Sequence, residues 1–147
     1  MSALRLPRTV LEGSFQQLRE CGAGRAECVV YWCASLDQPG LLNRVAHPVH
    51  QAGYGGYEVD SAWVTEFFLD LRRARETVRV QVHTHPREAG HSGIDDSFSL
   101  VPATGFLSLV IPAFATGPAG LAGTAMVRMQ PDGTWAPADP EEEFCLE

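Results

Sequence analysis

The stretch VRVQVHTHP, residues 78–86, alternates branched apolar side chains with polar ones. A period of two predicts a β-strand that carries Val78, Val80 and Val82 on one face. Extending the alternation puts His83 and His85 together on the opposite face, and the following proline ends the strand. Two imidazoles at i and i+2 on a strand end project the same way, so this stretch predicts both a sheet and a site at its end.

The residues upstream predict a helix and then a buried strand. Thr9 and Glu12 have the spacing of a capping box, and apolar residues recur on one face before Gly22. Glu27 then precedes CVVYWCA, whose β-branched, aromatic and small apolar side chains are typical of a buried strand. The sequence DQPG, residues 37–40, predicts the turn that ends it.

The middle of the chain predicts a strand, a loop and a second helix. Residues 41–49 can form a strand, although a proline near its end cannot donate to a sheet ladder. HQAGYGGYEV, residues 50–59, has three glycines beside two tyrosines and indicates an irregular loop. Asp60 or Ser61 can cap a helix that reaches about Glu76, with an apolar stripe at helical spacing.

Further along, the patterns predict a short helix over residues 92–100 and strands over residues 106–111 and 124–129. The acidic end, about residues 137–147, is expected to be a solvated tail. Strands and helices intermix without a regular βαβ alternation, so we expect an α+β fold, a mixed α/β sandwich with helices on both sides of a curved mixed sheet. The length fits a single domain over residues 1–147.

Composition excludes several classes of function. A net charge of −7 argues against a duplex nucleic-acid binder, which needs a cationic face. The N-terminal sequence MSALRLPRTV has no apolar run of signal-peptide length, and no stretch has the roughly 20 apolar residues of a membrane span. We therefore expect a cytoplasmic protein with no nucleic-acid or membrane partner.

The four cysteines, Cys21, Cys28, Cys33 and Cys145, include no CxxC pair. Their spacing therefore predicts neither a thiolate zinc site nor a redox motif. In a reducing cytosol we expect them to be small apolar filler. A cysteine hydrolase using Cys28 or Cys33 is disfavoured, because burial in a strand raises the pKa of a thiol and lowers its reactivity.

The segment that follows the strand adds polar groups to the two histidines. VHTHPREAGHSGIDD, residues 82–96, contains Ser92 and Asp95, whose separation of three puts hydroxyl and carboxylate on one side of a helical turn. His83, His85 and Asp95 would be three metal ligands, which leaves a fourth tetrahedral position open for water. An open position favours a catalytic metal over a structural one.

His-x-His-Pro followed by Ser-x-x-Asp, with a glutamate upstream, resembles the signature of the JAB/MPN (JAMM) metalloprotease family. The resemblance implies a cytidine-deaminase-like architecture and one Zn²⁺ per chain, held by His83, His85 and Asp95. It implies that Ser92 donates a hydrogen bond to the developing oxyanion. The motif covers about a tenth of the chain.

This chain has six residues between the second histidine and the serine, whereas the common form of the family has seven. The departure leaves Asp96 as an alternative ligand, but that choice would put Gly93, which has no hydroxyl, in the place of the serine. In the family the base is a glutamate at the start of an early core strand, after an N-terminal helix. Glu27 has that setting, with Glu20 as the alternative.

The double aspartate after His-Ser, and the phrase GFLSLVIPAFA, resemble bacterial members encoded beside ubiquitin-like conjugation enzymes, some of them in antiviral defence operons. The resemblance implies a zinc isopeptidase that cuts after the C-terminal glycine of a ubiquitin-like protein, either maturing it or releasing it from a target. Homologues of activating and conjugating enzymes would be further partners. The alternative is a non-catalytic MPN scaffold that binds a ubiquitin-like protein or its conjugating enzymes.

Overall fold

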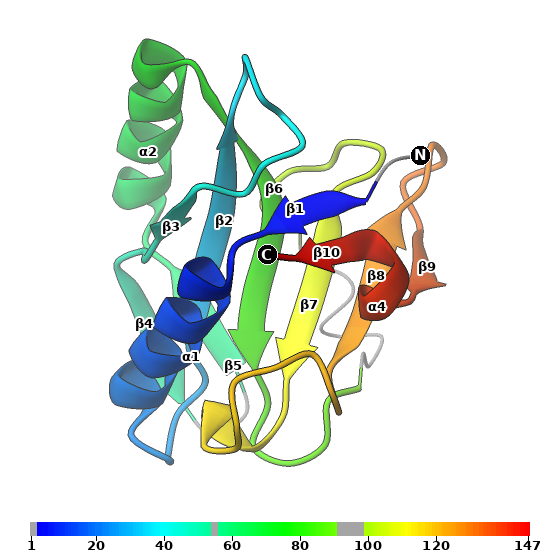
Figure 1. Cartoon of the computed structure of the whole chain (residues 1–147). Helices are drawn as coiled ribbons and strands as arrows, with labels where there is room; N and C mark the ends of the chain where they lie inside the picture. Colours follow the sequence, from blue (N-terminus) through cyan, green and yellow to red (C-terminus); the bar gives the residue numbers. More distant parts are fainter. Residues whose placement is uncertain (1–2, 54–55, 91–98) are drawn as a thin grey trace.

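A mixed sheet forms the centre of the molecule in the computed structural model, which describes residues 3–53, 56–90 and 99–147 (Figure 1). Within those ranges six strands are hydrogen-bonded side by side. Their order across the sheet is β3 (Arg44–Ala46), β2 (Val29–Ser35), β6 (Glu76–Thr84), β7 (Leu107–Ile111), β8 (Ala125–Met129) and β9 (Trp135–Ala138). Only the β6–β7 pair among them is parallel. The strands predicted over residues 28–34, 106–111 and 124–129 are thus present.

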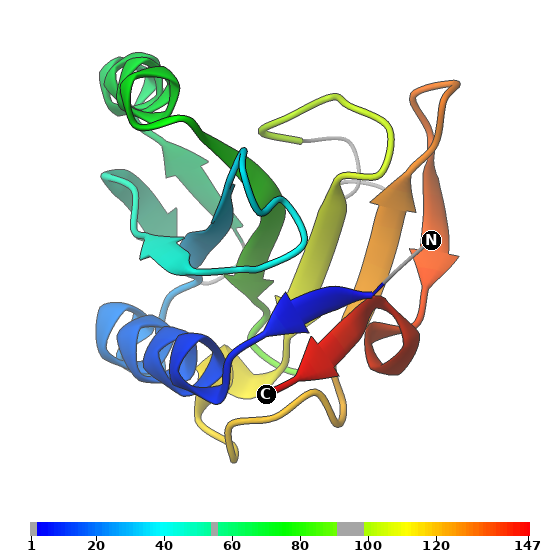
Figure 2. The same ribbon diagram turned by 45° about the horizontal axis from the view of Figure 1, so that its top comes forward.

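Helices lie on both sides of this sheet, as the sequence predicted (Figure 2). One face packs against α1 (Arg8–Gly22) and a small parallel pair formed by β1 (Leu4–Leu6) and β10 (Phe144–Leu146). The other face packs against α2 (Ser61–Ala74). The two sides are called the α1 face and the α2 face below. The predicted α+β class, a mixed sheet flanked by helices, is confirmed.

The α1 face is tied to the sheet by a buried polar contact. The indole N–H of Trp32 donates to the hydroxyl of Ser14 at 2.8 Å, and that hydroxyl donates to the carbonyl of Val10 at 2.7 Å. Both side chains are fully buried, so the pairing satisfies groups that would otherwise destabilise the core. The predicted capping box is wrong: α1 begins after Pro7, which makes no side-chain capping bond. Pro7 has extended backbone, with φ −61° and ψ 140°, so the helix starts at the next residue.

The α2 face is aromatic. Tyr31 of β2 stacks on Trp63 and Phe67 of α2, with ring centroids 6.1 and 5.9 Å apart. Asp60 caps this helix, because its carboxylate accepts from the Trp63 N–H at 2.9 Å, which confirms one of the two predicted caps. The helix ends at Ala74, slightly before the predicted end.

Strand β6 departs from the predicted alternation in two ways. The register with β2 shifts between Trp32 and Cys33, so that Arg79 forms a bulge between Val78 and Val80. Val78 therefore packs on the α2 face, whereas Val80 packs on the α1 face. The strand is also central and buried on both faces beyond the bulge, rather than half-buried.

The segment before α2 is more regular than predicted. Residues 50–59 were expected to be an irregular loop, but β4 (His50–Gly53) and β5 (Gly56–Val59) pair antiparallel. The strand expected over residues 41–49 is limited to β3, whose three residues pair with β2. Tertiary pairing has overridden the low strand propensity of glycine in β4 and β5.

The acidic end is not a solvated tail. A one-turn helix, α4 (Pro140–Glu143), leads into β10, and Phe144 is buried edge-on against Trp32 with centroids 5.6 Å apart. Glu143 pairs with Arg128 of β8, and the carboxylate of Glu147 accepts from Arg5 at 2.8 Å. One buried aromatic side chain and a parallel strand partner were enough to order a segment that looks hydrophilic. Within the described ranges, no helix combines the length and the apolar character needed to cross a bilayer.

Candidate metal centre

The two predicted histidine ligands lie at the carboxyl end of β6, beside the parallel strand β7. His83 is paired with Val29 of β2 on one side and with Val110 of β7 on the other. Just beyond the strand, the His85 N–H donates to the carbonyl of Ile111 at 2.9 Å. The backbone on both sides of this histidine pair is therefore fixed by hydrogen bonds within the sheet.

Glu27 lies against the same pair. The strand β2 begins at Val29, and continuing its antiparallel register by two residues brings Glu27 opposite His85. The ligand atoms of Glu27, His83 and His85 all lie within 4.8 Å of one another. Glu27 and His83 are each only 3% exposed, and the two imidazole rings have centroids 5.3 Å apart. The structure thus brings together three of the five predicted site residues, from two strands.

Backbone and side-chain bonds around Thr84 lock the two strands at this point. The Cys28 N–H donates to the Thr84 hydroxyl at 3.0 Å, and the Thr84 N–H donates to the Cys28 carbonyl at 3.1 Å. Both residues are fully buried. Because side chains alternate along a strand, Thr84 and Cys28 point to the α1 face while Glu27 and the two histidines point the other way.

Two neighbouring segments border the centre. The Glu27 N–H donates to the carbonyl of Gly53 in β4 at 2.8 Å, and the ring of Tyr57 in β5 lies 5.5 Å from that of His83. On the other side, the Phe114 N–H donates to the His85 carbonyl at 2.9 Å. Phe114 belongs to the short helical turn η1 (Ala113–Ala115), whose three residues all have positive φ between 53° and 61°. Left-handed backbone at non-glycine residues is costly and concentrates at functional sites.

The remaining predicted site residues, Ser92 and Asp95, lie outside the described residues, as does the alternative ligand Asp96. The described part of the chain continues at residue 99, and Leu100 lies on the α2 face. The Leu100 N–H donates to the side-chain carbonyl of Gln81 at 3.1 Å, and the amide of Gln81 donates to Ser108 at 3.1 Å. Gln81 is 2% exposed and lies two residues before His83, so its side chain holds Leu100 beside β6. In the sequence analysis Gln81 was only one of the polar residues of the alternation. An amide between two valines of a predicted strand was a signal of a buried hydrogen-bonding role.

The chemistry of this donor set fits a divalent metal. Two imidazoles and a carboxylate, without a thiolate, are the ligands of catalytic zinc sites, and the buried setting strengthens electrostatic contacts. These residues could hold one ion together, with Glu27 either as a ligand or as a base beside it. The alternative base, Glu20, belongs to α1, on the other side of the sheet.

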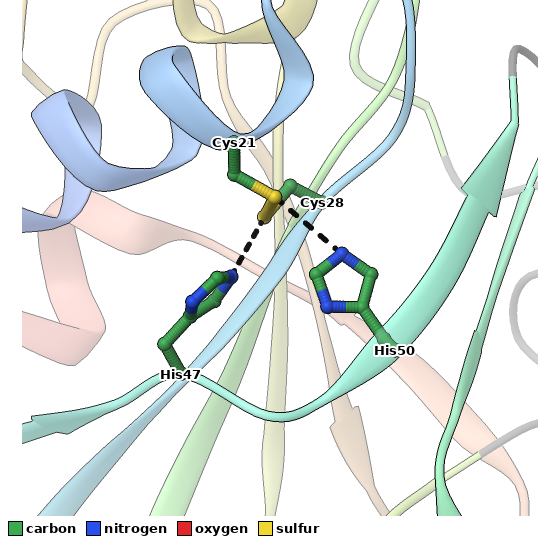
Figure 3. Close-up of side chains that lie close together, drawn as sticks. All are labelled: Cys21, Cys28, His47 and His50. Carbon is green, nitrogen blue, oxygen red and sulfur yellow. Dashed lines mark hydrogen bonds between the residues drawn. A yellow bond between two sulfur atoms is a disulfide. The ribbon is translucent and has the colours of Figure 1, made fainter.

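A second group of metal-binding side chains lies on the α1 side (Figure 3). Cys21 and Cys28 form a disulfide, which corrects the expectation that the cysteines are unpaired filler. His47 and His50 approach the two sulfur atoms, and the ligand atoms of all four residues lie within 4.8 Å of one another. Burial, with a smaller contribution from His50, lowers the pKa of His47 below its ordinary value. No sequence motif predicted this group, because six residues separate the cysteines and other segments supply the histidines.

The other two cysteines are free thiols. Burial raises the pKa of Cys33 to about 12. A thiol in that environment stays protonated near neutral pH and is a poor nucleophile. This agrees with the expectation that a cysteine hydrolase built on Cys33 is disfavoured.

Comparisons with known proteins bear on the fold and on one stretch of the sequence. No family model matches the chain. A protein of Sinorhizobium fredii named "Probable metalloprotease" is 39% identical over 59 residues, which cover 40% of this chain. The matched region is 36% of that relative, so the chain spans about a third of the length of the curated protein it matches.

Two solved structures resemble the whole chain. A protein from Desulfitobacterium hafniense superposes with a TM-score of 0.70 at 15% identity, over 98% of this chain and 92% of its own. A JAB1/MPN domain protein from Archaeoglobus fulgidus superposes with a TM-score of 0.56 at 14% identity, over 99% of this chain and all of its own. The resemblance to the JAB/MPN family read from the histidine motif is therefore confirmed, and the chain has the JAB1/MPN fold.

Proposed function

We propose that this chain is a zinc-dependent isopeptidase or peptidase that hydrolyses the bond after the C-terminal glycine of a ubiquitin-like protein. The observation that carries the proposal is the meeting of Glu27 with His83 and His85 at the end of β6. Two imidazoles and a carboxylate are the donor set of catalytic zinc sites, and their convergence from two strands supports such a site here. The partial match to a metalloprotease supports the same conclusion.

In this proposal His83, His85 and Asp95 hold the metal, and Asp96 is the alternative to Asp95. Zinc bound there would supply a Lewis acid that makes water acidic enough to attack near neutral pH. Glu27 takes a proton from the attacking water and returns it to the leaving amine, which is general base and then general acid catalysis.

Ser92 would donate a hydrogen bond to the oxygen that becomes negative during attack. The Ser-x-x-Asp spacing that follows the two histidines supports this role.

The small residues in the segments that border the centre support an extended, small-residue substrate end. The β4–β5 pair contacts Glu27 and His83, and η1 contacts His85 from the opposite side. Both segments are rich in glycine or alanine, which suits a channel for a diglycine-like tail. Such a tail would bind extended beside a strand, where main-chain hydrogen bonds provide affinity. Precursor maturation and release from a conjugate are both consistent with this geometry.

The proposal is tested with Glu27→Gln. We expect the variant to bind one zinc ion as the native protein does, but to lose about 10²- to 10⁴-fold in turnover because proton transfer is removed. The substrate is a ubiquitin-like protein ending in Gly-Gly that carries a fluorogenic amide, and metal content is measured by elemental analysis.

Glu20→Gln is the matched control, since it makes the same change at the alternative glutamate on α1. Unchanged turnover in Glu27→Gln, or an equal loss in Glu20→Gln, would contradict the assignment of the base.

A non-catalytic scaffold that binds a ubiquitin-like protein or its conjugating enzymes remains the second candidate. The occurrence of the MPN fold in both enzymes and docking modules supports keeping it, since a fold by itself does not define a function. Metal content separates the two. Stoichiometric zinc with cleavage of the fluorogenic amide favours the enzyme, whereas binding of the ubiquitin-like protein without metal or cleavage favours the scaffold.

A further inference from the structure

Four side chains on the α1 side of the sheet form a cluster that the proposed hydrolysis does not use. Cys21 comes from the last turn of α1, and Cys28 directly precedes β2. His47 follows β3, and His50 is the first residue of β4 (Figure 3). Their ligand atoms lie within 4.8 Å of one another. Such convergence from three separate segments is what a metal site requires.

The distances match those of a tetrahedral ion. The Cys21 sulfur lies 3.4 Å from Nε2 of His50, and the Cys28 sulfur lies 3.3 Å from Nε2 of His47. With zinc–sulfur and zinc–nitrogen bonds of about 2.3 and 2.0–2.1 Å, tetrahedral ligand atoms are about 3.5 Å apart. The imidazole nitrogens therefore already stand near the positions that ligands would occupy, and only the two sulfur atoms must separate.

The orientation of His50 favours ligation through Nε2. Its Nδ1 lies 2.9 Å from the carbonyl oxygen of Pro48. A carbonyl can only accept, so Nδ1 carries the proton, and Nε2 of the neutral ring presents its lone pair toward the sulfur atoms. An imidazole held through its other nitrogen by a backbone carbonyl is the usual arrangement of a metal-bound histidine.

Charge also favours zinc. Two thiolates and two neutral imidazoles carry a total charge of −2, which balances the charge of a divalent cation. This balance suits a setting in which Cys28 is fully buried. Closed four-ligand sites with two cysteines and two histidines are structural zinc sites rather than catalytic ones. The cluster has no open position for a substrate.

We propose that the reduced protein binds a second, structural zinc ion through Cys21, Cys28, His47 and His50, and that the disulfide is the alternative state of this site. Reduction adds two electrons and two protons to the disulfide and gives two thiols. A phosphine reductant supplies the electrons and is oxidised to its oxide with the oxygen of one water. Each thiol then releases its proton when it binds the ion.

The disulfide joins the end of α1 to the residue before β2, and the zinc ion would join both of these to the segment that carries His47 and His50, beside the candidate metal centre. Glu27 precedes Cys28, and its N–H is held by Gly53, three residues after His50. A clip between Cys28 and His50 therefore stabilises the backbone on both sides of Glu27. The second zinc ion is a positioning element in this view and takes no part in the reaction.

Cobalt titration tests the proposal, because Co²⁺ replaces zinc and thiolate ligands give an intense charge-transfer absorption that imidazole and carboxylate ligands do not. The native protein is reduced with a phosphine, and thiol counting in denaturant verifies that all four cysteines are reduced. We expect the charge-transfer band in the reduced protein, together with one more bound equivalent than in the disulfide form. No band at saturating Co²⁺ would overturn the proposal.

Two variants test whether the charge-transfer band arises from this cluster. Cys21→Ser should lower the affinity for the second Co²⁺ ion. The loss should be at least the roughly 10- to 100-fold that removal of an outer-shell partner costs a metal site. Cys145→Ser, which removes an exposed free thiol, should leave affinity and band unchanged. A band that survives in Cys21→Ser and disappears in Cys145→Ser would assign the metal elsewhere. The charge-transfer band does not depend on cleavage. The second metal site can therefore be disproved while the proposed hydrolase stands, and the hydrolase can be disproved while the second metal site stands.

Discussion

The two histidine clusters of this molecule lie on opposite faces of the sheet at the same strand ends, and they offer different sets of donor atoms. The cluster of Glu27, His83 and His85 faces α2 and consists of imidazole and carboxylate donors. The cluster of Cys21, Cys28, His47 and His50 faces α1 and pairs imidazole with sulfur. Consecutive residues, Glu27 and Cys28, contribute one member to each. The comparison shows how the alternation of a strand gives neighbouring residues separate chemistry on opposite faces.

The largest difference between the clusters should be in turnover. We expect His83→Asn to remove the catalytic metal and to reduce turnover by about 10³-fold or more, because several kcal/mol of electrostatic stabilisation are lost. His47→Asn makes the same change in the other cluster and should lower turnover by no more than about tenfold, through looser positioning alone. Cleavage of the fluorogenic amide and the cobalt charge-transfer band are measured for both.

The band should disappear from His47→Asn or weaken there, and remain in His83→Asn. Equal losses of turnover in the two variants would contradict the division into a catalytic and a structural cluster.

Thr84 lies where the clusters meet, and its replacement should disturb both by a smaller amount. Thr84→Val leaves the Cys28 N–H without the hydroxyl that accepts from it, which should lower the free energy of unfolding by about 1–3 kcal/mol. Thr84→Ser keeps the acceptor and is the control. Urea unfolding at constant metal concentration measures the change. A Thr84→Val protein as stable as Thr84→Ser would show that this bond does not hold the two strands together.

The smallest effect concerns Cys33, a cysteine on the α2 face that belongs to neither cluster. Its thiol has a pKa raised from 9.0 to about 12 by burial, so the folded state retains a proton that the unfolded state releases. Stability is then full below pH 9 and falls as pH rises toward 12, by up to about 1.4 kcal/mol per pH unit.

We expect Cys33→Ala to flatten this decline, whereas Cys145→Ala, at an exposed thiol, should not. Urea midpoints at pH 8 and pH 10.5 give the slopes. An identical decline in the native protein and in Cys33→Ala would show that another group, such as the buried Tyr31, causes it.

Sequence reasoning predicted the fold class and three site residues that the structure brings together, because both are encoded by local patterns. The alternation around Val80 and Val82 predicted the central strand, and His-x-His-Pro predicted two imidazoles on one side. Glu27 was found by its place before a buried strand, and the register of β2 against β6 brings it to the histidines. Ser92 and Asp95 stay predictions, since they lie outside the described residues.

The errors share one physical cause, which is that long-range pairing leaves no local periodicity. Residues 50–59 became a strand pair although glycines disfavour strands, and the acidic end became β10 because Phe144 packs on Trp32. The bulge at Arg79 changed the face of Val78 without changing the sequence pattern. In each case a partner distant in sequence supplied the stabilisation that local propensity lacked.

The sequence by itself determined the strand and helix order of the core and a histidine pair suited to a metal, since these depend on the periods of 2 and 3.6. Tertiary structure alone decided that Cys21 meets Cys28 and that His47 and His50 close around them. The ligand atoms come together because α1, β2 and the start of β4 pack against one another. The spacing of these residues along the chain does not predict that packing.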